Sequence, residues 1–180
     1  YQRSGTDKKI LAEVPVNDDH TYSITVPFDK PGTATVDCGQ WQGVDVWLED
    51  ENMDIDFRGI DTAKIKIKNP PYVYIRAGKK NEVMNLVNFV GYRGYQAMIA
   101  ISQNVWKTKI EDQKEKSTLT NAMYDANYDN SDAWMKYIVE HYADMTSVLV
   151  PLSQLDEDKD VDLINATLSH LESTSESAKQ

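Results

Sequence analysis

The chain has 180 residues, of which 41% are apolar and 27% are charged, and these fractions are typical of a globular rather than a disordered protein. Its single cysteine excludes an internal disulfide, a CxxC redox pair and a zinc site built from several cysteines. The formal net charge is −10 and basic residues form no cluster, which argues against nucleic acid or an anionic membrane surface as a partner.

The N-terminal part of the chain shows the alternation of apolar and polar residues that is typical of half-buried strands. Residues 10–16 and 21–26 flank the polar cluster 17–20, so we expect them to form a hairpin. Further strand-like segments follow at residues 33–38, 44–49, 53–58, 64–68 and 72–75. About seven such segments, spaced by about ten residues, predict an antiparallel β-sandwich or a partly open barrel.

The pattern changes after Gly78. Apolar residues then recur with a period of about 3.6, which predicts a helix over residues 81–107. Gly91 and Gly94 lie inside this helix, where each costs about 1 kcal/mol relative to alanine, so we expect a kink or close packing against the sheet there.

Shorter helices are expected further along the chain. They are placed around residues 119–126, after a cap at Ser131 and after a cap at Asp160. The tail over residues 172–180 is expected to fray or to serve as a linker. No apolar run approaches the ~20 residues of a membrane-spanning helix. The predicted fold class is α+β, with a β-sandwich-like domain over residues 1–78 followed by an antiparallel helical region over residues 79–180.

Acidic and histidine residues are the candidates for metal binding. Four aspartates alternate over residues 156–162, but an EF-hand needs glycine and glutamate where this chain has Val161 and Thr167. We interpret the aspartates as a solvated loop and an acidic helix start. The histidines are far apart in the sequence, with local explanations in a turn and near helix ends: they are His20, His141 and His170.

No motif of a zinc protease, a serine hydrolase or a nucleotide-binding loop occurs in the sequence. The lone Cys38 is interpreted as a small buried hydrophobic residue. The sequence therefore assigns no catalytic, cofactor-binding or metal-binding residue. A hydrolase or metalloenzyme built from acidic and histidine side chains is the least favoured hypothesis.

Aromatic residues are the other candidate surface. They are Trp41, Trp47, Tyr72 and Tyr74 in the β part and Tyr92, Tyr95 and Trp106 in the long helix. Exposed aromatic rings on a sandwich would form a carbohydrate platform or a protein-contact patch. Packing between sheet and helices is the interpretation we favour.

Several stretches of the chain resemble a known family. The strings VPVNDDHTYSITVPFDKPGTATVDC and VDVWLEDENMDIDF, over residues 14–38 and 44–57, resemble the β-rich N-terminal domain of Bacteroidetes TlpA/ResA-like thiol-disulfide oxidoreductases. Residues 77–82 (AGKKNE) are similar to the family's Gly-x-x-Asn entry into its helical region. Residues 131–155 resemble the helices that precede its thioredoxin-like domain.

The resemblance carries expectations about function. The family is exported, often lipid-anchored, and has its CxxC in a C-terminal thioredoxin-like domain, which these residues do not include. It implies a cell-envelope or periplasmic location, a thioredoxin-like domain attached after Gln180, and no redox role for residues of this chain. The implied function is non-catalytic, namely to position or dimerise the redox domain or to recognise its protein client. The alternative is a glycan-binding or adhesive surface module.

Overall fold

A computed structural model describes residues 1–39, 42–58 and 72–174. The chain divides into two compact units, Tyr1–Met84 and Asn85–Gln180, and each is described by itself. The first unit contains short antiparallel strands and the second is helical, so the predicted α+β class is confirmed.

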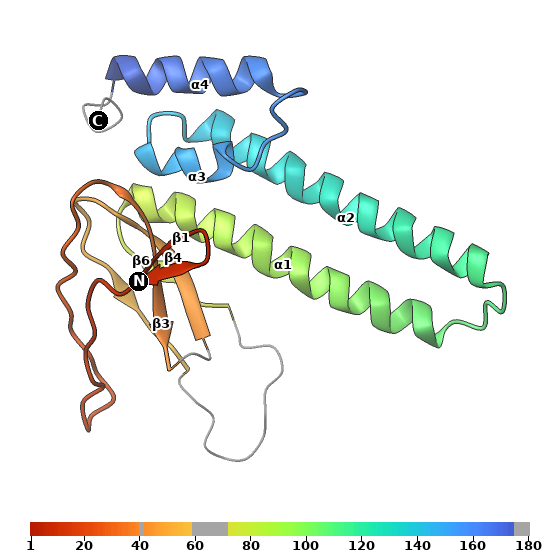
Figure 1. The fold of residues 1–180 in the computed structure, drawn as a ribbon, viewed down its shortest axis with the longest axis horizontal. Coiled ribbons are helices and arrows are strands. Elements are labelled where there is room, and N and C mark those ends of the chain that lie inside the picture. The colour runs from red at the N-terminus through yellow and green to blue at the C-terminus, as the bar shows by residue number, and fades with distance from the viewer. Residues whose placement is uncertain (40–41, 59–71, 175–180) are drawn as a thin grey trace. The chain divides into compact units, whose positions relative to one another are not determined.

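The strands of the first unit are short. They are β1 (Gln2–Ser4), β2 (Asp7–Lys9), β3 (Gly32–Cys38), β4 (Gln42–Leu48), β5 (Asp54–Ile55) and β6 (Ile75–Arg76). Within the part of the chain that the structure describes, they pair as three two-stranded antiparallel sheets, β1 with β2, β3 with β4 and β5 with β6 (Figure 1). The strand predicted over residues 64–68 lies outside the described residues.

The sheet of β3 and β4 is the most regular part of this unit and confirms two predicted strands. Its register pairs Ala34 with Val46, and both side chains are buried. The alternation read from the sequence therefore follows the pleat, because successive side chains point to opposite faces of a sheet. The backbone of Tyr1 extends the sheet by exchanging two hydrogen bonds with Thr35, of 2.9 and 2.7 Å.

The predicted hairpin over residues 10–26 is only partly formed. The turn is where the sequence places it, because the Asn17 amide donates to the Thr21 carbonyl and the His20 amide to the Asn17 carbonyl. The segments on either side are extended but are not β-strands. We call residues 10–28 the arm. Alternation predicts which segments are extended, but ladder pairing depends on a neighbouring strand that alternation does not specify.

The start of the long helix is fastened to the edge of β4 by one buried asparagine. Asn81 is 0% exposed. Its Oδ1 accepts from the Trp47 amide at 2.8 Å, and its Nδ2 donates to the Trp47 carbonyl at 3.0 Å. The side-chain amide thus supplies the donor and the acceptor that a neighbouring strand would supply. It satisfies two backbone groups that would otherwise be buried without partners.

Glu51 completes this junction. Its carboxylate accepts from the amides of Lys80 and Asn81, at 2.9 and 3.1 Å, and so caps the first turn of the helix. The Lys80 ammonium forms ion pairs with Glu49 at 2.9 Å and Asp50 at 2.6 Å. Burial lowers the pKa of Lys80, but the hydrogen bonds to these two carboxylates outweigh it and raise the pKa. A side chain at Gly78 would overlap the Glu51 carboxylate, which explains the glycine.

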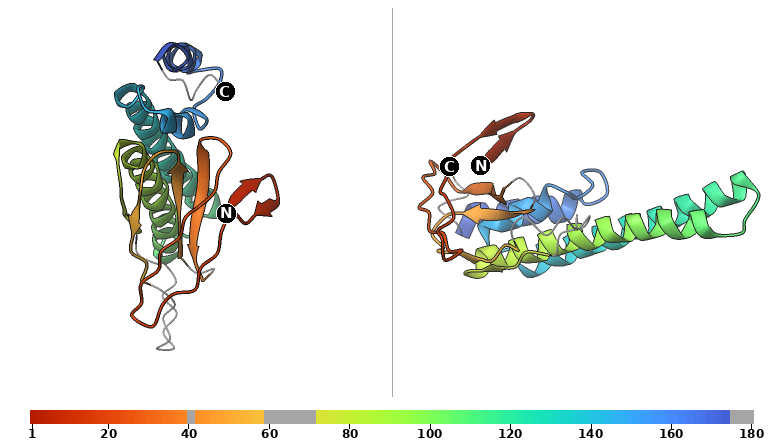
Figure 2. Two further views of the ribbon diagram at one scale, coloured as in Figure 1. Left: turned by 90° about the vertical axis from the view of Figure 1, so that its left-hand side faces the viewer. Right: turned by 90° about the horizontal axis from the view of Figure 1, so that it is seen from below.

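Helices make up the second unit. They are α1 (Lys79–Lys107), whose first residues belong to the first unit, α2 (Gln113–His141), the 3₁₀ helix η1 (Thr146–Val148), α3 (Leu149–Leu152) and α4 (Val161–Thr174). From residue 85 onward α1 runs antiparallel to α2, and the two lie side by side (Figures 1 and 2). The core near the end of α2 is formed by Ile138, Val139, Val148 and Leu171, all at most 1% exposed.

The structure tests the predictions made for the two glycines of α1 and for the cap at Ser131. Helix α1 is continuous through both glycines, and the packing against the sheet that we expected is wrong: an added Cβ at Gly94 would lie 3.4 Å from Ser131 Oγ of α2, and one at Gly91 would meet nothing within 4 Å. The cap predicted at Ser131 is wrong, because α2 is continuous through it. The Ser131 hydroxyl donates to the carbonyl of Asn127, one turn earlier, so it is satisfied inside the helix.

Helix α4 begins next to the predicted cap. The Asp160 carbonyl accepts from the Ile164 amide at 2.9 Å, as the residue before a helix does. The Asp160 carboxylate forms an ion pair with Lys136 of α2 at 3.0 Å, and Lys136 also contacts Asp132 at 2.9 Å. Hydrogen bonds to Asp132 and Asp160 raise the pKa of Lys136. This bridge holds the start of α4 against α2.

Candidate functional site

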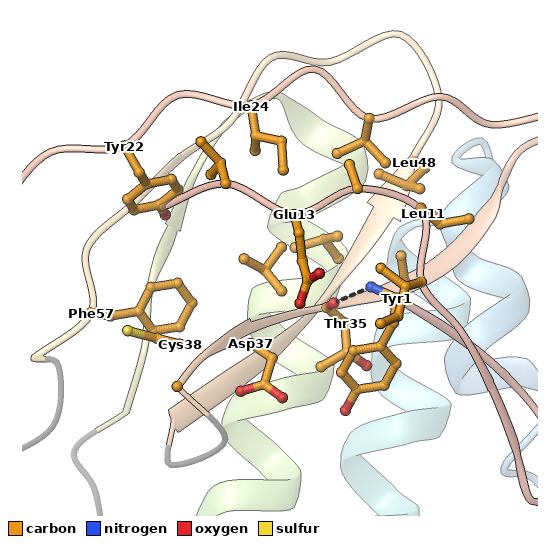
Figure 3. Close-up of a pocket in the computed structure, with 18 of the residues that line it drawn as sticks. Tyr1, Leu11, Glu13, Tyr22, Ile24, Thr35, Asp37, Cys38, Leu48 and Phe57 are labelled. Carbon is orange, nitrogen blue, oxygen red and sulfur yellow. Dashed lines mark hydrogen bonds between the residues drawn. The ribbon is translucent and has the colours of Figure 1, made fainter. Parts of the chain in front are cut away.

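The first unit contains a cavity of about 350 Å³ between the arm and the β3–β4 sheet (Figure 3). This volume lies in the range of ligand pockets, about 300–1,000 Å³. The wall on the arm side includes Tyr22, Ile24 and Val26, and the sheet side includes Ala34 and Val36. These residues are the apolar members of the alternating patterns at 21–26 and 33–38, so the two predicted apolar faces line one cavity.

Four of the exposed apolar side chains described in this unit line the cavity, whereas Phe28 and Tyr74 lie outside it. Ile10, Val14, Val16 and Ile24 are 55%, 40%, 56% and 36% exposed, and all four line it. Scattered exposed apolar residues are ordinary, whereas a group of them around one hollow is typical of a binding surface. The cavity is therefore the candidate functional site.

The arm approaches the cavity in a way that a regular strand would not. Residues 10–14 all line it, although only alternate residues of a flat strand face one side. The acidic side chain of Glu13 is consequently turned inward together with its apolar neighbours. Figure 3 shows Glu13 extending from the arm toward Thr35 of β3, on the same side as Asp37.

One side of the cavity is polar. Asp37 is half-buried and forms an ion pair with Lys8 at 3.6 Å. The Lys8 ammonium also lies 3.8 Å from the centre of the Tyr1 ring. The carboxylates of Glu13 and Asp37 thus line the cavity together with Lys8, and Asp37 is paired with Lys8 whereas Glu13 has no ion pair among the described residues. A further cation is the complementary charge for Glu13.

Tyr22 connects the arm to β5. The Tyr22 hydroxyl donates to the Ile55 carbonyl at 2.7 Å, and the Tyr22 and Phe57 ring centres are 6.5 Å apart. Burial, and to a lesser degree the neighbouring Cys38, raises the pKa of Tyr22. Cys38, predicted to be buried, is half-buried and lies beside Phe57 in the cavity wall (Figure 3).

The backbone on both sides of the arm's turn is extended and does not belong to a sheet. Between described residues, the backbone hydrogen bonds of the arm are the two bonds of its turn. Residues 10–16 and 22–28 are exposed or half-buried, so water can serve their amides and carbonyls. The cavity is thus bordered by extended chain whose hydrogen-bonding groups are available to a ligand.

The candidate metal ligands of the sequence do not converge. Over the described ranges, no group of three His, Cys, Asp or Glu residues could hold a metal ion. His141 stacks on Tyr137 with ring centres 3.8 Å apart, whereas His170 contacts Asp144. His20 lies in the arm's turn with φ of 66°.

The aspartates of residues 156–162 serve local structure. The Asp156 carboxylate accepts from the amides of Asp158 and Lys159 at 3.0 and 3.1 Å, which caps a turn. Hydrogen bonds from the amide and the ammonium of Lys159 lower the pKa of Asp156. These contacts agree with the solvated loop that the sequence indicates.

The predicted aromatic surface is reduced in the β part, whereas Tyr95 and Trp106 of α1 are 59% and 77% exposed and Tyr92 is half-buried. Trp47 is 5% exposed and its indole Nε1 donates to Glu49 at 2.8 Å, so it cannot belong to an exposed platform. Trp41 lies outside the described residues. Tyr74 is 56% exposed, whereas Tyr72 is half-buried and burial raises its pKa to about 12.

Neither family models, nor curated proteins, nor solved structures give a match to this chain. Of the helices in the described ranges, none has the length and apolar character needed to cross a membrane. The cavity supplies apolar contact area, two carboxylates and available backbone groups. It can hold an apolar chain and a cation by non-covalent contacts.

Proposed function

We propose that this chain is a non-catalytic accessory module of an exported thiol-disulfide oxidoreductase, and that its first unit recognises protein clients. The resemblance of residues 14–38, 44–57, 77–82 and 131–155 to the TlpA/ResA-like family supports the redox connection and a place in the cell envelope. In this proposal the CxxC chemistry belongs to a thioredoxin-like domain attached after Gln180.

The observation that carries client recognition is the cavity between the arm and β3. A client of a disulfide oxidoreductase is an unfolded or partly folded polypeptide, and such a chain exposes apolar side chains. Four exposed apolar residues of the arm surround a cavity of about 350 Å³ that could cover such side chains. The finer architecture we propose is an open sandwich, in which the arm is one layer and β3 and β4 are the other.

The second unit supports the positioning part of the proposal. Helix α2 has 29 residues, which at 1.5 Å per residue corresponds to about 43 Å. Because α1 from residue 85 onward and α2 run antiparallel, the pair brings the chain back toward the level of residue 85, so in this proposal it is a rigid support for the redox domain and not a spacer.

Two experiments test the proposal. The first reads the coding sequence beyond Gln180, where we expect an in-frame thioredoxin-like domain with a CxxC motif. A stop codon there, or a downstream domain without CxxC, contradicts the redox connection.

The second experiment measures binding of the chain to a reduced, carboxymethylated protein and to the same protein in its native, disulfide-bonded form. We expect binding to the unfolded form alone. Equal binding to both forms contradicts client recognition. Binding to polysaccharides instead, lost on Tyr74→Ala, favours the glycan-binding alternative.

A further inference from the structure

The arm combines three properties that bear on what it can bind. Its backbone is extended over residues 10–16 and 22–28 and does not belong to a sheet within the described part of the chain. Its apolar side chains are exposed around a cavity. Its Glu13 carboxylate points into that cavity and has no ion pair among the residues that the structure describes (Figure 3).

The extended backbone of the arm determines which kind of ligand can bind. Extended backbone presents amides and carbonyls in a row, with a repeat of about 3.3 Å per residue. A second extended polypeptide has the same repeat and can pair with residues 22–28, as in strand addition at a sheet edge, because alternate residues there, Tyr22, Ile24 and Val26, line the cavity as in a regular strand. A compact small molecule could pair with only one or two of these groups.

The second property selects the side chains of that ligand. An added strand turns alternate side chains toward the cavity and the others toward water. The cavity walls at Val14, Ile24 and Val36 are aliphatic, so the inward positions favour aliphatic side chains. A volume of about 350 Å³ limits the number of side chains that enter.

The Glu13 carboxylate favours a positive charge on the ligand. Asp37 already has Lys8 at 3.6 Å, whereas Glu13 lacks such a partner in the described residues. The chain as a whole carries a net charge of −10, which attracts basic segments over a longer range. A lysine or arginine next to the inward aliphatic residues would pair with Glu13.

We propose that the cavity binds an extended polypeptide segment by strand addition to the arm, with alternate aliphatic side chains in the cavity and a basic residue on Glu13. The inference rests on the proposed client recognition and specifies the part of the client that is bound. It predicts a preference for basic, alternating apolar–polar segments over other unfolded chain.

The test uses the whole 180-residue chain and fluorescein-labelled peptides of eight residues. The parent peptide alternates valine with threonine and carries one lysine at its centre. Two further peptides are N-methylated at alternate residues in each of the two phases, and another replaces lysine with glutamate. Fluorescence anisotropy measures the dissociation constant of each.

We expect the parent peptide to bind and N-methylation in one phase to weaken binding by about tenfold, because backbone hydrogen bonds are lost. The glutamate peptide should bind about two- to fivefold more weakly than the parent. Equal binding of both N-methylated peptides and the parent would overturn strand addition. Equal binding of the lysine and glutamate peptides would overturn the role of the basic residue.

Variants of the chain locate the site. Glu13→Gln should weaken binding of the lysine peptide about two- to fivefold, while Glu140→Gln, an exposed residue of α2, should leave it unchanged. Val14→Asn should weaken binding, and Val161→Asn, at a valine of α4 that is 46% exposed against 40% for Val14, should not. Circular dichroism checks that each variant is folded. Equal effects of site and control variants place the binding elsewhere and overturn the inference.

Failure of this inference can be separated from failure of the proposed function. If the carboxymethylated client binds but the parent peptide does not, strand addition is wrong and client recognition stands. If the parent peptide binds but no CxxC domain follows Gln180, the site stands and the redox connection is wrong. If sedimentation shows dimers that the peptide does not disrupt and Val14→Asn does, the occupant is a second copy and the inference is overturned.

Discussion

Replacement of Asn81 by alanine should destabilise the first unit, because it leaves the backbone amide and carbonyl of Trp47 without hydrogen-bond partners. The truncation removes the acceptor of the Trp47 amide and the donor to the Trp47 carbonyl, which are 2.8 and 3.0 Å from the Asn81 side chain. Trp47 is 5% exposed, so both groups are left in a site that water reaches poorly. Each unsatisfied buried group costs about 1–3 kcal/mol.

The expected loss is about 2–4 kcal/mol in the free energy of unfolding. The upper limit of this range is smaller than the sum of the two penalties for unsatisfied groups. Alanine has a higher helix propensity than asparagine by roughly 0.5 kcal/mol, and water can enter the space that the truncated side chain leaves. The control is Asn104→Ala, an exposed asparagine of the same helix whose Nδ2 donates to the Ala100 carbonyl. Its effect should stay within about 0.5 kcal/mol.

Two measurements check this. Urea unfolding followed by circular dichroism gives the free energy, and hydrogen exchange reports the Trp47 amide, which should exchange faster in Asn81→Ala than in the control. A stability within about 0.5 kcal/mol of the parent, or unchanged exchange at Trp47, would refute the junction's energetic role.

Three further predictions follow from other features. Gly78→Ala should destabilise the chain by about 1–2 kcal/mol, because the new methyl group displaces the Glu51 carboxylate from the helix amides. Gly91→Ala is the control, because a methyl group there would meet open space, and it should be neutral or stabilising by up to about 1 kcal/mol. Equal free energies of unfolding for the two variants in urea would contradict the overlap between a Gly78 side chain and Glu51. Alkylation of Cys38, the single cysteine, should slow when the lysine peptide is bound, and an unchanged rate places the peptide outside the cavity. Burial, with a smaller contribution from Tyr74, raises the pKa of Tyr72 to about 12, so its phenolate absorbance at 295 nm should appear late in a titration and vanish in Tyr72→Phe. Because the folded chain keeps this proton to a higher pH than the unfolded chain does, the free energy of unfolding should fall as the pH rises from 10 to 12. The same fall in the Tyr72→Phe variant would contradict this prediction.

Local periodicity predicts much of this fold. The alternation at residues 33–38 and 44–48 corresponds to β3 and β4, and the 3.6-residue period corresponds to α1. These elements are readable because their buried faces recur within a few residues. The sequence predicts two helices, with a boundary at Ser131, where the structure has the single helix α2. A serine can either cap a helix or form a hydrogen bond within one, and which of the two it does depends on the surrounding backbone.

The junction and the cavity depend on contacts that periodicity does not contain. Gly78 and Asn81 stand out as a motif, but their roles come from Glu51 and Trp47, about 30 residues earlier in the chain. Glu13 was not predicted as a site residue, since in a flat strand it would alternate with its neighbours instead of joining them at one cavity. The proposed sandwich and the redox connection stay predictions.

The Glu51 and Asn81 contacts also determine where a shortened version of this protein can end. The pattern changes from strand to helix at Gly78, and that position invites truncation. A fragment stopping there would omit Asn81 and the two amides that Glu51 caps, leaving the edge of β4 uncovered. Extending the fragment through Met84 retains that first helical turn, so the isolated β-rich piece should be prepared as residues 1–84.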